Sequence, residues 1–461
     1  MQLPGHRDEP LERGIQRIRE QFDVPGEFPA HVLAAAEEAA RRRPDGAYFD
    51  RTAAPFVTLD PATATDLDQA FTIDRDGEDL VLHYAIADVG FFVTPGSPVD
   101  VEAWRRGVTV FLPGARAPLY PRVLSEAAAS LLPDGPRPSV VFMVRVRPDG
   151  DARLDGVERA VIHSRAKLAY DTVATEELPD GFAELARRVE VAEERRDAAR
   201  VEFPEQQLSR TDGRWDLRFR PRSESEERNA ALSLATNLAV AEALHAAGTG
   251  LFRVMPAPDA RAIRRLRHSA RAFGLTWPPD QSLADFERTL QREDPRHAAF
   301  LLAVRKASGA ASYAAHRGGE TPWHAAVAAT YAHATAPMRR LADRYVIEAA
   351  LAVANGRPVP DTVAVAFGEL PAVMAETETR ADRVDSAVLD LAEAVMLSGR
   401  EGEVFDAVVV DEDHRGVVIQ VVEPAVLARV EAHRVDPGDD VRVRLASVDI
   451  ESRRIEFTRV G

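Results

Sequence analysis

The chain of 461 residues contains no cysteine. Disulfide bonds, thiolate metal sites and a thiol nucleophile are therefore excluded. No apolar run approaches the roughly 18 residues that a membrane-spanning helix requires, and the first residues lack the apolar core of a secretory signal. We therefore expect a cytoplasmic protein that has no membrane partner.

Lysine is nearly absent, since it occurs only at Lys167 and Lys306, and arginine supplies almost all of the positive charge. Acidic residues outnumber basic ones by 74 to 58, which gives a net charge of −16. A negative chain is unusual among proteins that bind nucleic acid. Arginine is nonetheless the better partner for phosphate, so the composition allows a basic channel inside an acidic shell.

Three carboxylates lie close together early in the chain, at Asp60, Asp66 and Asp68. Carboxylates at this spacing repel one another and need compensation. A hard cation such as Mg²⁺ provides it, because Mg²⁺ prefers oxygen ligands and takes only a few carboxylates. The alternative is a solvated acidic turn in which Asp60 or Asp66 caps the local backbone.

The residues on either side of this cluster predict two strands joined by a turn. Residues 56–59 and 71–73 are rich in β-branched and aromatic residues, which favour strands. Pro61 and the small polar residues after it favour a turn. Asp66 and Asp68, two apart in an extended segment, should then project to the same side.

Residues 58–70 resemble the signature of the ribonuclease II family, the RNB-domain exoribonucleases. The resemblance implies that Asp60, Asp66 and Asp68 hold one or two Mg²⁺ ions and that Asp68 acts in catalysis. The family usually has a fourth aspartate where this chain has Gln69. That change removes one negative charge, and Gln69 would ligate through its carbonyl oxygen.

A second motif, Tyr331–Arg344, resembles the family pattern Y-A-x-x-T-S-P-I-R-R-Y-x-D. Pro337 is expected in the first turn of a helix, where a missing N–H group costs nothing. Arg339 would lie in the same turn, beside the positive end of the helix, where phosphate is favoured. The resemblance implies that Arg339 binds RNA and stabilises charge on the scissile phosphate.

Three further matches imply contacts with RNA or with the reacting phosphate. Phe111 occupies the aromatic position of R-G-x-S-x-Y-L-P-G, where the family stacks a ring on a base, and stacking requires only a π face. Tyr170 is the tyrosine of the family motif S-x-A-K-L-x-Y-x-x-V, and in the family this tyrosine lies close to the reacting phosphate. Phe203, in a weaker match, would be the second aromatic that holds a base.

Residues 380–390 resemble a family helix that carries a catalytic glutamate. The register of the match selects Asp385 as the corresponding acid. Asp382, one turn earlier on the same face, is the alternative. Either acid is one methylene shorter than the glutamate of the family.

The fold class predicted from these features is α+β, with three domains. Residues 1–48 would form a small helical domain, in the manner of a helix-turn-helix, in place of the cold-shock domains that relatives often carry. Residues 49–397 would form the RNB catalytic domain. Residues 398–461 contain five short strands, as expected for an RNA-binding OB barrel of the ribosomal-protein S-one type.

The function predicted from the resemblance is that of a monomeric, Mg²⁺-dependent, hydrolytic 3′→5′ exoribonuclease. It would degrade single-stranded RNA processively to nucleoside 5′-monophosphates, and contacts with the 2′-OH would exclude DNA as a substrate. Two alternatives remain. One is an RNA-binding protein with weakened catalysis, motivated by Gln69 and Asp385. The other is a distributive phosphodiesterase acting on short oligoribonucleotides, motivated by the acidic surface and the short N-terminal segment.

Overall fold

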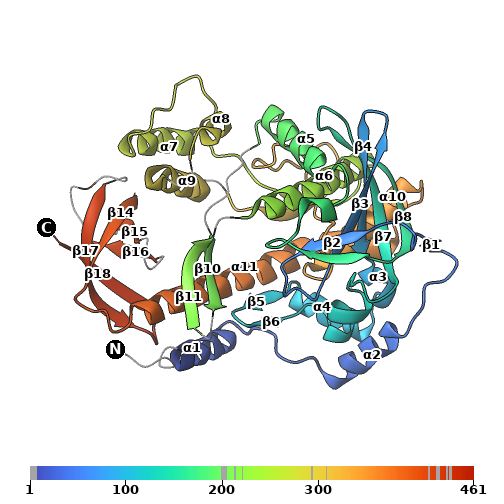
Figure 1. Cartoon of the computed structure of the whole chain (residues 1–461), viewed down its shortest axis with the longest axis horizontal. Helices are drawn as coiled ribbons and strands as arrows, with labels where there is room; N and C mark the ends of the chain where they lie inside the picture. Colours follow the sequence, from blue (N-terminus) through green and yellow to red (C-terminus); the bar gives the residue numbers. More distant parts are fainter. Residues whose placement is uncertain are drawn as a thin grey trace.

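The computed structural model describes most of the chain, namely residues 8–198, 205–211, 214–220, 222–291, 294–307, 309–413, 416–421, 426–431, 435 and 439–460. Figure 1 shows two main bodies, a large mixed domain on the right and a small barrel on the left. The long helix α11 runs from one to the other, and the two-stranded hairpin β10–β11 stands between them. This mixture of helices and strands confirms the predicted fold class.

The helices are α1 (Asp8–Gln21), α2 (Ala30–Ala40), α3 (Val89–Phe92), α4 (Pro98–Arg106), α5 (Phe182–Arg195), α6 (Glu224–Ala246), α7 (Ala260–Ala272), α8 (Leu283–Arg288), α9 (Pro295–Ala307), α10 (Leu341–Ala354) and α11 (Asp361–Leu397). Two short helical turns, Leu124–Ala128 and Thr175–Glu177, accompany them. None of the helices in the described ranges is long and apolar enough to cross a membrane.

The strands are β1 (Phe49–Asp50), β2 (Val57–Asp60), β3 (Gln69–Asp76), β4 (Asp79–Ala87), β5 (Val110–Leu112), β6 (Ala115–Ala117), β7 (Arg137–Val146), β8 (Ala152–Ile162), β9 (Ala166–Ala169), β10 (Glu205–Thr211), β11 (Arg214–Arg220), β12 (Leu251–Val254), β13 (Ser312–Ala315), β14 (Val404–Asp413), β15 (Gly416–Val421), β16 (Val426–Val430), β17 (Asp440–Asp449) and β18 (Arg454–Val460).

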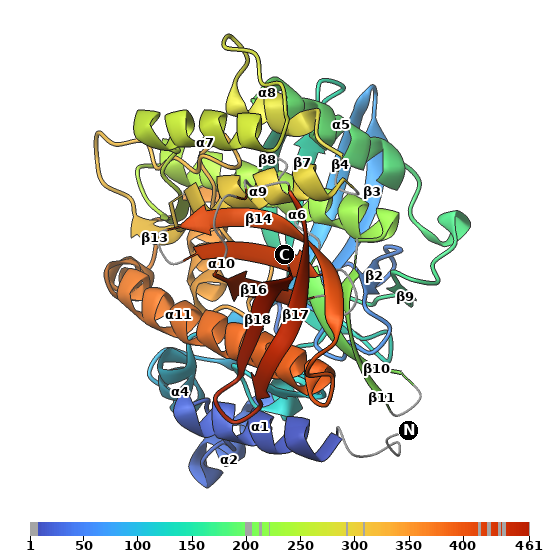
Figure 2. The same cartoon turned by 90° about the vertical axis from the view of Figure 1, so that its left-hand side faces the viewer.

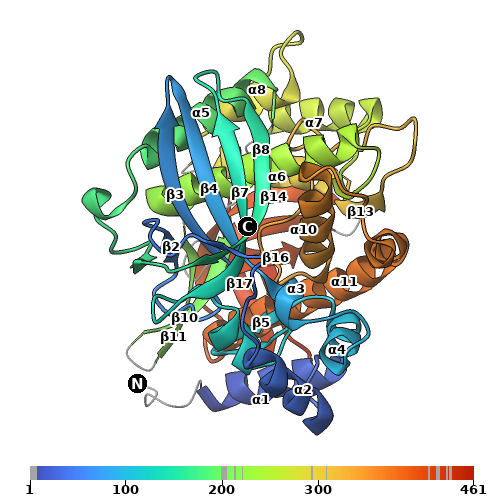
Figure 3. The same ribbon diagram turned by 90° about the vertical axis from the view of Figure 1, so that its right-hand side faces the viewer.

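The large domain is built on a seven-stranded sheet of order β1-β8-β7-β4-β3-β2-β9. Strands β3, β4, β7 and β8 form an antiparallel meander, while β2 pairs in parallel with β9. Figure 3 shows the meander face-on, with α10 beside β8. Val140, Val141 and Phe142 are consecutive and all buried, which indicates that both faces of the inner strand β7 are covered.

Two helices form within residues 1–48, as predicted, and they join different hydrophobic cores. Leu11 and Ile18 of α1 pack with residues of α11, whereas Val32 of α2 belongs to the main core of the large domain. Gly14 allows α1 to approach α11 closely, because a Cβ atom at Gly14 would lie 2.4 Å from a methyl group of Leu391. The domain boundary at residue 48 stays a prediction.

The five strands predicted at the C-terminus are all present and form a nearly closed barrel. Their order is β16-β15-β14-β17-β18, and the outer strands β16 and β18 also contact each other. Burial alternates along β15, where Val417, Ile419 and Val421 point inward, as a small barrel requires. Figure 2 shows α11 passing beside the barrel and α7 and α9 lying above it.

Candidate active site

The strand–turn–strand arrangement around the aspartates matches the prediction. Strand β2 ends at Asp60, β3 begins at Gln69, and Val57 pairs with Phe71 across the two strands. Ser130 fixes the connecting segment from outside, because its hydroxyl accepts the N–H group of Leu67 at 2.9 Å. The carboxylates are therefore held on a backbone that is anchored at both ends.

Asp68 is buried, with 4% of its surface exposed, and two groups from one distant turn bind it. The Met338 N–H group donates to Oδ1 at 2.8 Å, and Nε of Arg339 donates to Oδ2 at 3.3 Å. Burial raises the pKa of Asp68 to about 7, although the positive charge of Arg339 lowers it. The pKa of Asp68 therefore lies near neutral pH, and the carboxyl group contacts the permanent positive charge of Arg339.

Asp60 has a buried oxygen, Oδ2, that has no hydrogen-bond partner in the described part of the chain. Burial raises the pKa of Asp60 to about 6, and Arg339 opposes that rise. A buried carboxylate oxygen without a partner is costly. It is also the hard oxygen donor that Mg²⁺ prefers.

Asp66 is compensated by an arginine that the sequence analysis did not single out. Nη1 of Arg116 lies 2.5 Å from Oδ1 of Asp66, and its Nη2 group bonds Thr65 at 2.8 Å and Glu126 at 2.9 Å. Arg116 lies on β6 directly opposite Phe111 on β5. The local sequence around Arg116 carries no pattern that would have revealed this role.

The prediction that Pro337 and Arg339 lie in the first turn of a helix is wrong. Helix α10 begins only at Leu341, and residues 336–339 form a turn in front of it. Two N–H groups of this turn bind carboxylates: Ala336 donates to Asp343 at 2.9 Å, and Met338 donates to Asp68. The helix does not begin earlier because Arg340 is extended, with φ −131° and ψ 123°, and pairs with Val108. The carbonyl oxygen of Arg339 accepts from the Thr109 N–H group at 3.0 Å.

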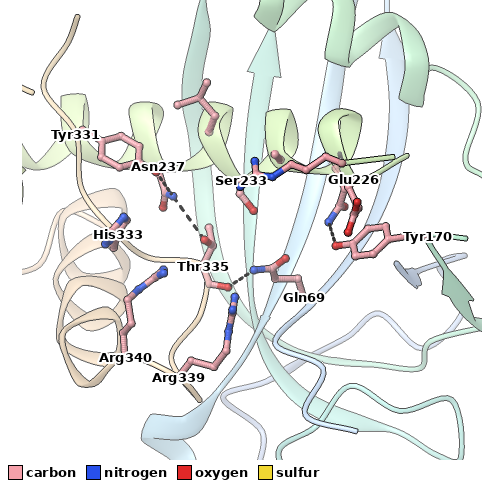
Figure 4. A pocket seen from close by; sticks show the side chains of 14 residues that line it. Gln69, Tyr170, Glu226, Ser233, Asn237, Tyr331, His333, Thr335, Arg339 and Arg340 are labelled. Carbon is pink, nitrogen blue, oxygen red and sulfur yellow. Dashed lines mark hydrogen bonds between the residues drawn. The ribbon is translucent and has the colours of Figure 1, made fainter. Parts of the chain in front are cut away.

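A polar cavity of about 480 Å³ lies beside this turn. Its volume falls within the range of about 300–1,000 Å³ that is usual for ligand sites. Figure 4 shows Arg339 and Gln69 projecting toward it from two segments, with Tyr170 on one side and His333 on the other. Burial lowers the pKa of His333 well below its usual range, so its ring contributes no positive charge to the cavity at neutral pH.

Helix α6 lines the cavity with polar residues at every fourth position, namely Asn229, Ser233 and Asn237. Residues spaced by four share one face of a helix. The amide of Asn229 donates to the hydroxyl of Tyr170 at 2.9 Å and fixes its position, while burial raises the pKa of Tyr170. These residues were not predicted from the sequence to belong to the site, although their spacing is a usable signal.

The remaining predicted site residues lie in different places. Phe111, on β5, is 49% exposed. Strand β5 pairs with β6, and Arg116 of β6 contacts Asp66. Asp385 lies on an exposed part of α11. Phe203 falls outside the described residues. Among the residues that the structure describes, no three acidic or histidine side chains gather closely enough to form a metal site by themselves.

An aspartate cluster balanced by arginine beside a polar cavity, with a five-stranded barrel at the C-terminus, is the arrangement expected of an RNB-domain protein. Comparison with known families agrees with this class. The RNB domain matches residues 49–353, and the RNase II-type exonuclease C-terminal S1 domain matches residues 403–460. The chain therefore belongs to the RNB-domain family.

The curated relatives include proteins named Ribonuclease R and Exoribonuclease 2. The chain is 25% identical to Ribonuclease R of Aquifex aeolicus, in an alignment covering 96% of this chain and 70% of that protein. It is 27% identical to Exoribonuclease 2 of Cronobacter sakazakii, covering 91% and 70%. The match to Ribonuclease R of Chlamydia muridarum, also 27% identical, covers 71% of this chain and spans only half of that relative's length.

Solved structures share the fold at low sequence identity. Mycoplasma genitalium RNase R in complex with ribose methylated single-stranded RNA superposes with a TM-score of 0.87 at 19% identity, covering all of this chain and 79% of that one. Yeast Ssd1, a pseudonuclease, gives a TM-score of 0.69 at 19% identity, covering 94% and 57%. The same fold therefore occurs in a nuclease and in a protein described as a pseudonuclease.

Proposed function

We propose that this protein is a monomeric, Mg²⁺-dependent 3′→5′ exoribonuclease that degrades single-stranded RNA processively by hydrolysis to nucleoside 5′-monophosphates. The observation that carries the proposal is the contact between Asp68 and Arg339 beside a polar cavity. A buried acid with a raised pKa next to an arginine and a cavity is the arrangement typical of a reaction centre. Membership of the RNB-domain family supports the same activity.

The oxygen donors of the site suit a magnesium ion. The buried Oδ2 of Asp60, which has no hydrogen-bond partner in the part of the chain that the structure describes, is the feature that a cation would satisfy, and Asp66 and Asp68 would complete the ligand set. Mg²⁺ usually takes one or two carboxylates together with waters and substrate phosphate, so a site with few converging acids fits it. When bound, the one or two ions would supply an activated water and stabilise the leaving 3′ oxygen.

The side chains of the chain itself would bind and orient the substrate. Arg339 is 44% exposed despite its contact with Asp68, so its guanidinium is accessible to the scissile phosphate and would neutralise the developing charge. Tyr170, fixed by Asn229, would lie on the opposite side of that phosphate. Asp385 remains a candidate for a further acid in the reaction.

Single-stranded RNA is the substrate that the surroundings of the site favour. Phe111 presents an exposed ring on the hairpin that Arg116 joins to Asp66, and an exposed ring next to a reaction centre suits base stacking without sequence preference. Phe203 would provide the second ring. Polar groups of the cavity wall would read the ribose 2′-OH, which distinguishes RNA from DNA. The RNA-bound state of the Mycoplasma relative supports this choice.

The test is a time course on single-stranded RNA labelled at the 3′ or the 5′ end, with Mg²⁺, with EDTA, and with a DNA of the same sequence. We expect immediate release of mononucleotide from the 3′ label, only with metal and only from RNA. Processive action would leave full-length 5′-labelled RNA and short end products, without intermediates. Release from the 5′ label first, or cleavage in EDTA, would contradict the proposal.

The alternative of an RNA-binding protein with weakened catalysis has one specific observation in its favour, namely that Gln69 replaces an acid of the family pattern. The fold of the pseudonuclease Ssd1 is a precedent. Intact RNA that is nevertheless shifted in a gel would support this alternative. Cleavage of dinucleotides as fast as of long chains would instead support the distributive phosphodiesterase.

A further inference from the structure

Gln69 follows Asp68 directly, and both ends of its amide are engaged within the protein. Its Nε2 group donates to the carbonyl oxygen of Thr335 at 2.5 Å, and the hydroxyl of Tyr84 donates to Oε1 at 2.9 Å. A backbone carbonyl only accepts hydrogen bonds. The orientation of the Gln69 amide is therefore fixed by its partners, and Oε1 faces Tyr84.

The partner of Gln69 lies in the segment that presents Arg339. Thr335 directly precedes the turn 336–339, and Met338 of that turn binds Asp68. The neighbouring residues Asp68 and Gln69 therefore both bind this segment. Asp68 accepts from the N–H group of Met338, and Gln69 donates to the carbonyl group of Thr335. Figure 4 shows the bond between Gln69 and Thr335 beside the guanidinium of Arg339.

An acidic side chain at position 69 would not make this contact. An ionised carboxylate only accepts hydrogen bonds, so aspartate or glutamate would face the Thr335 carbonyl oxygen without a proton between them. The amide is the group that this contact requires.

We propose that Gln69 is a positioning residue, which holds the Arg339 turn through Thr335, and that it is not a ligand of the cation. The proposal rests on the proposed function for the role of Arg339 at the phosphate. Asp60, Asp66 and Asp68 then supply the protein ligands without Gln69. It also replaces the prediction that Gln69 ligates through its carbonyl oxygen, because the bonds to Thr335 and Tyr84 turn Oε1 toward Tyr84.

The first measurement is Mn²⁺ binding to the full chain without RNA, for the wild type and for Gln69→Leu, by electron paramagnetic resonance. Leucine removes both the donor and the possible ligand. We expect the Mn²⁺ dissociation constant of Gln69→Leu to stay within about twofold of the wild-type value. A weakening of tenfold or more, in a variant whose thermal unfolding is unchanged, would show that Gln69 is a ligand and overturn the proposal.

The second measurement is turnover of single-stranded RNA by Gln69→Glu, which keeps the side-chain shape, removes the donor and introduces a negative charge. The positioning role predicts a fall in kcat of roughly 10- to 100-fold, as is usual when a supporting contact is lost. A ligand role predicts retained or increased kcat, because a carboxylate binds Mg²⁺ better than an amide. Tyr84→Phe is the matched control: it leaves the bond to Thr335 intact and should cost about threefold or less.

A third measurement does not depend on turnover and so separates this proposal from the proposed function. In EDTA, the affinity for labelled single-stranded RNA should fall by the same factor in Gln69→Leu and in Arg339→Ala. The double variant should bind as weakly as Arg339→Ala alone, because the effects of two residues that act as one unit do not add. Additive losses would overturn the positioning role. A wild type that binds RNA in this way but never hydrolyses it would refute only the proposed function.

Discussion

Two buried carboxyl groups in this protein have nearly the same burial but different surroundings. Asp68 is 4% exposed and Glu393 is 5% exposed, and burial raises the pKa of each to about 7. Asp68 is bound by Arg339 and by a backbone N–H group beside the cavity. Glu393 lies on α11 and accepts from the Gln206 amide at 2.7 Å and from the Leu427 N–H group at 3.1 Å.

The difference between these groups shows that a raised pKa alone does not identify a catalytic acid, because burial produces it in either place. Glu393 connects α11 to the hairpin β10–β11 and to the barrel, which is a structural task. Asp68 combines burial with a permanent cation and a ligand-sized cavity, and Asp60 in the same segment has a buried oxygen without a hydrogen-bond partner among the described residues. It is this combination that marks the candidate active site, and four substitutions test it.

The largest expected effect is that of Asp68→Asn. Losing a ligand to the cation should remove several kcal/mol of transition-state stabilisation, which corresponds to roughly a thousandfold in kcat. RNA affinity in EDTA should be nearly unchanged, because asparagine keeps the shape of the site and Arg339 remains. Single-turnover hydrolysis and fluorescence anisotropy measure the two quantities. Loss of RNA binding together with activity, in a folded variant, would contradict this assignment.

Glu393→Gln is the matched control, because it neutralises the other buried acid. The pKa of Glu393 is raised in the folded state from an ordinary 4.5 to about 7, so the stability that its protonated form contributes is present below pH 4.5 and is lost as the pH rises through 7. The variant should match the wild type near pH 4.5 and exceed its unfolding free energy by about 3 kcal/mol at pH 8. Urea unfolding at both pH values measures this difference.

Full RNA hydrolysis by Glu393→Gln would sharpen the contrast with Asp68→Asn. A thousandfold loss of activity would instead show that Glu393 takes part in the reaction, and the contrast with Asp68 would then be wrong. An equal stability difference at the two pH values would mean that the Glu393 carboxyl does not titrate as described.

Phe111→Ala tests the exposed side of the site. Base stacking on an aromatic ring contributes about 1–3 kcal/mol per base, so the affinity for single-stranded RNA should fall by that amount. The melting temperature should hardly change, because half of the ring is already exposed to solvent. Phe111→Tyr should restore binding. A variant that loses stability but not affinity would show that Phe111 is a packing residue.

Asp385→Asn should have the smallest effect. Asp385 is an exposed acid on the same helix as Glu393, and none of its contacts in the described ranges joins it to Asp60, Asp66 or Asp68. We expect kcat to fall by about tenfold at most, as for a supporting residue, with Asp382→Asn as the matched variant one turn away. A fall as large as that of Asp68→Asn would make Asp385 a principal acid of the reaction.

The sequence by itself determined the local structure of this protein. Strand-forming residues around the turn at Pro61 placed Asp60 at the end of one strand and Asp68 just before the next, and alternating valines at the C-terminus specified five barrel strands. These features depend on side-chain periodicity and on turn chemistry within a few residues, which a single sequence displays directly.

Only the tertiary structure decided which groups compensate the aspartates. Met338 and Thr335 lie 270 and 266 residues from Asp68 and Gln69, the residues they bind, and Arg116 reaches Asp66 from a hairpin with no distinctive sequence. The start of α10 also depends on distant residues, because the pairing of Arg340 with Val108 holds Arg340 in an extended conformation. Pairing across such distances depends on how the whole chain packs, so neither local propensity nor motif spacing could have specified it.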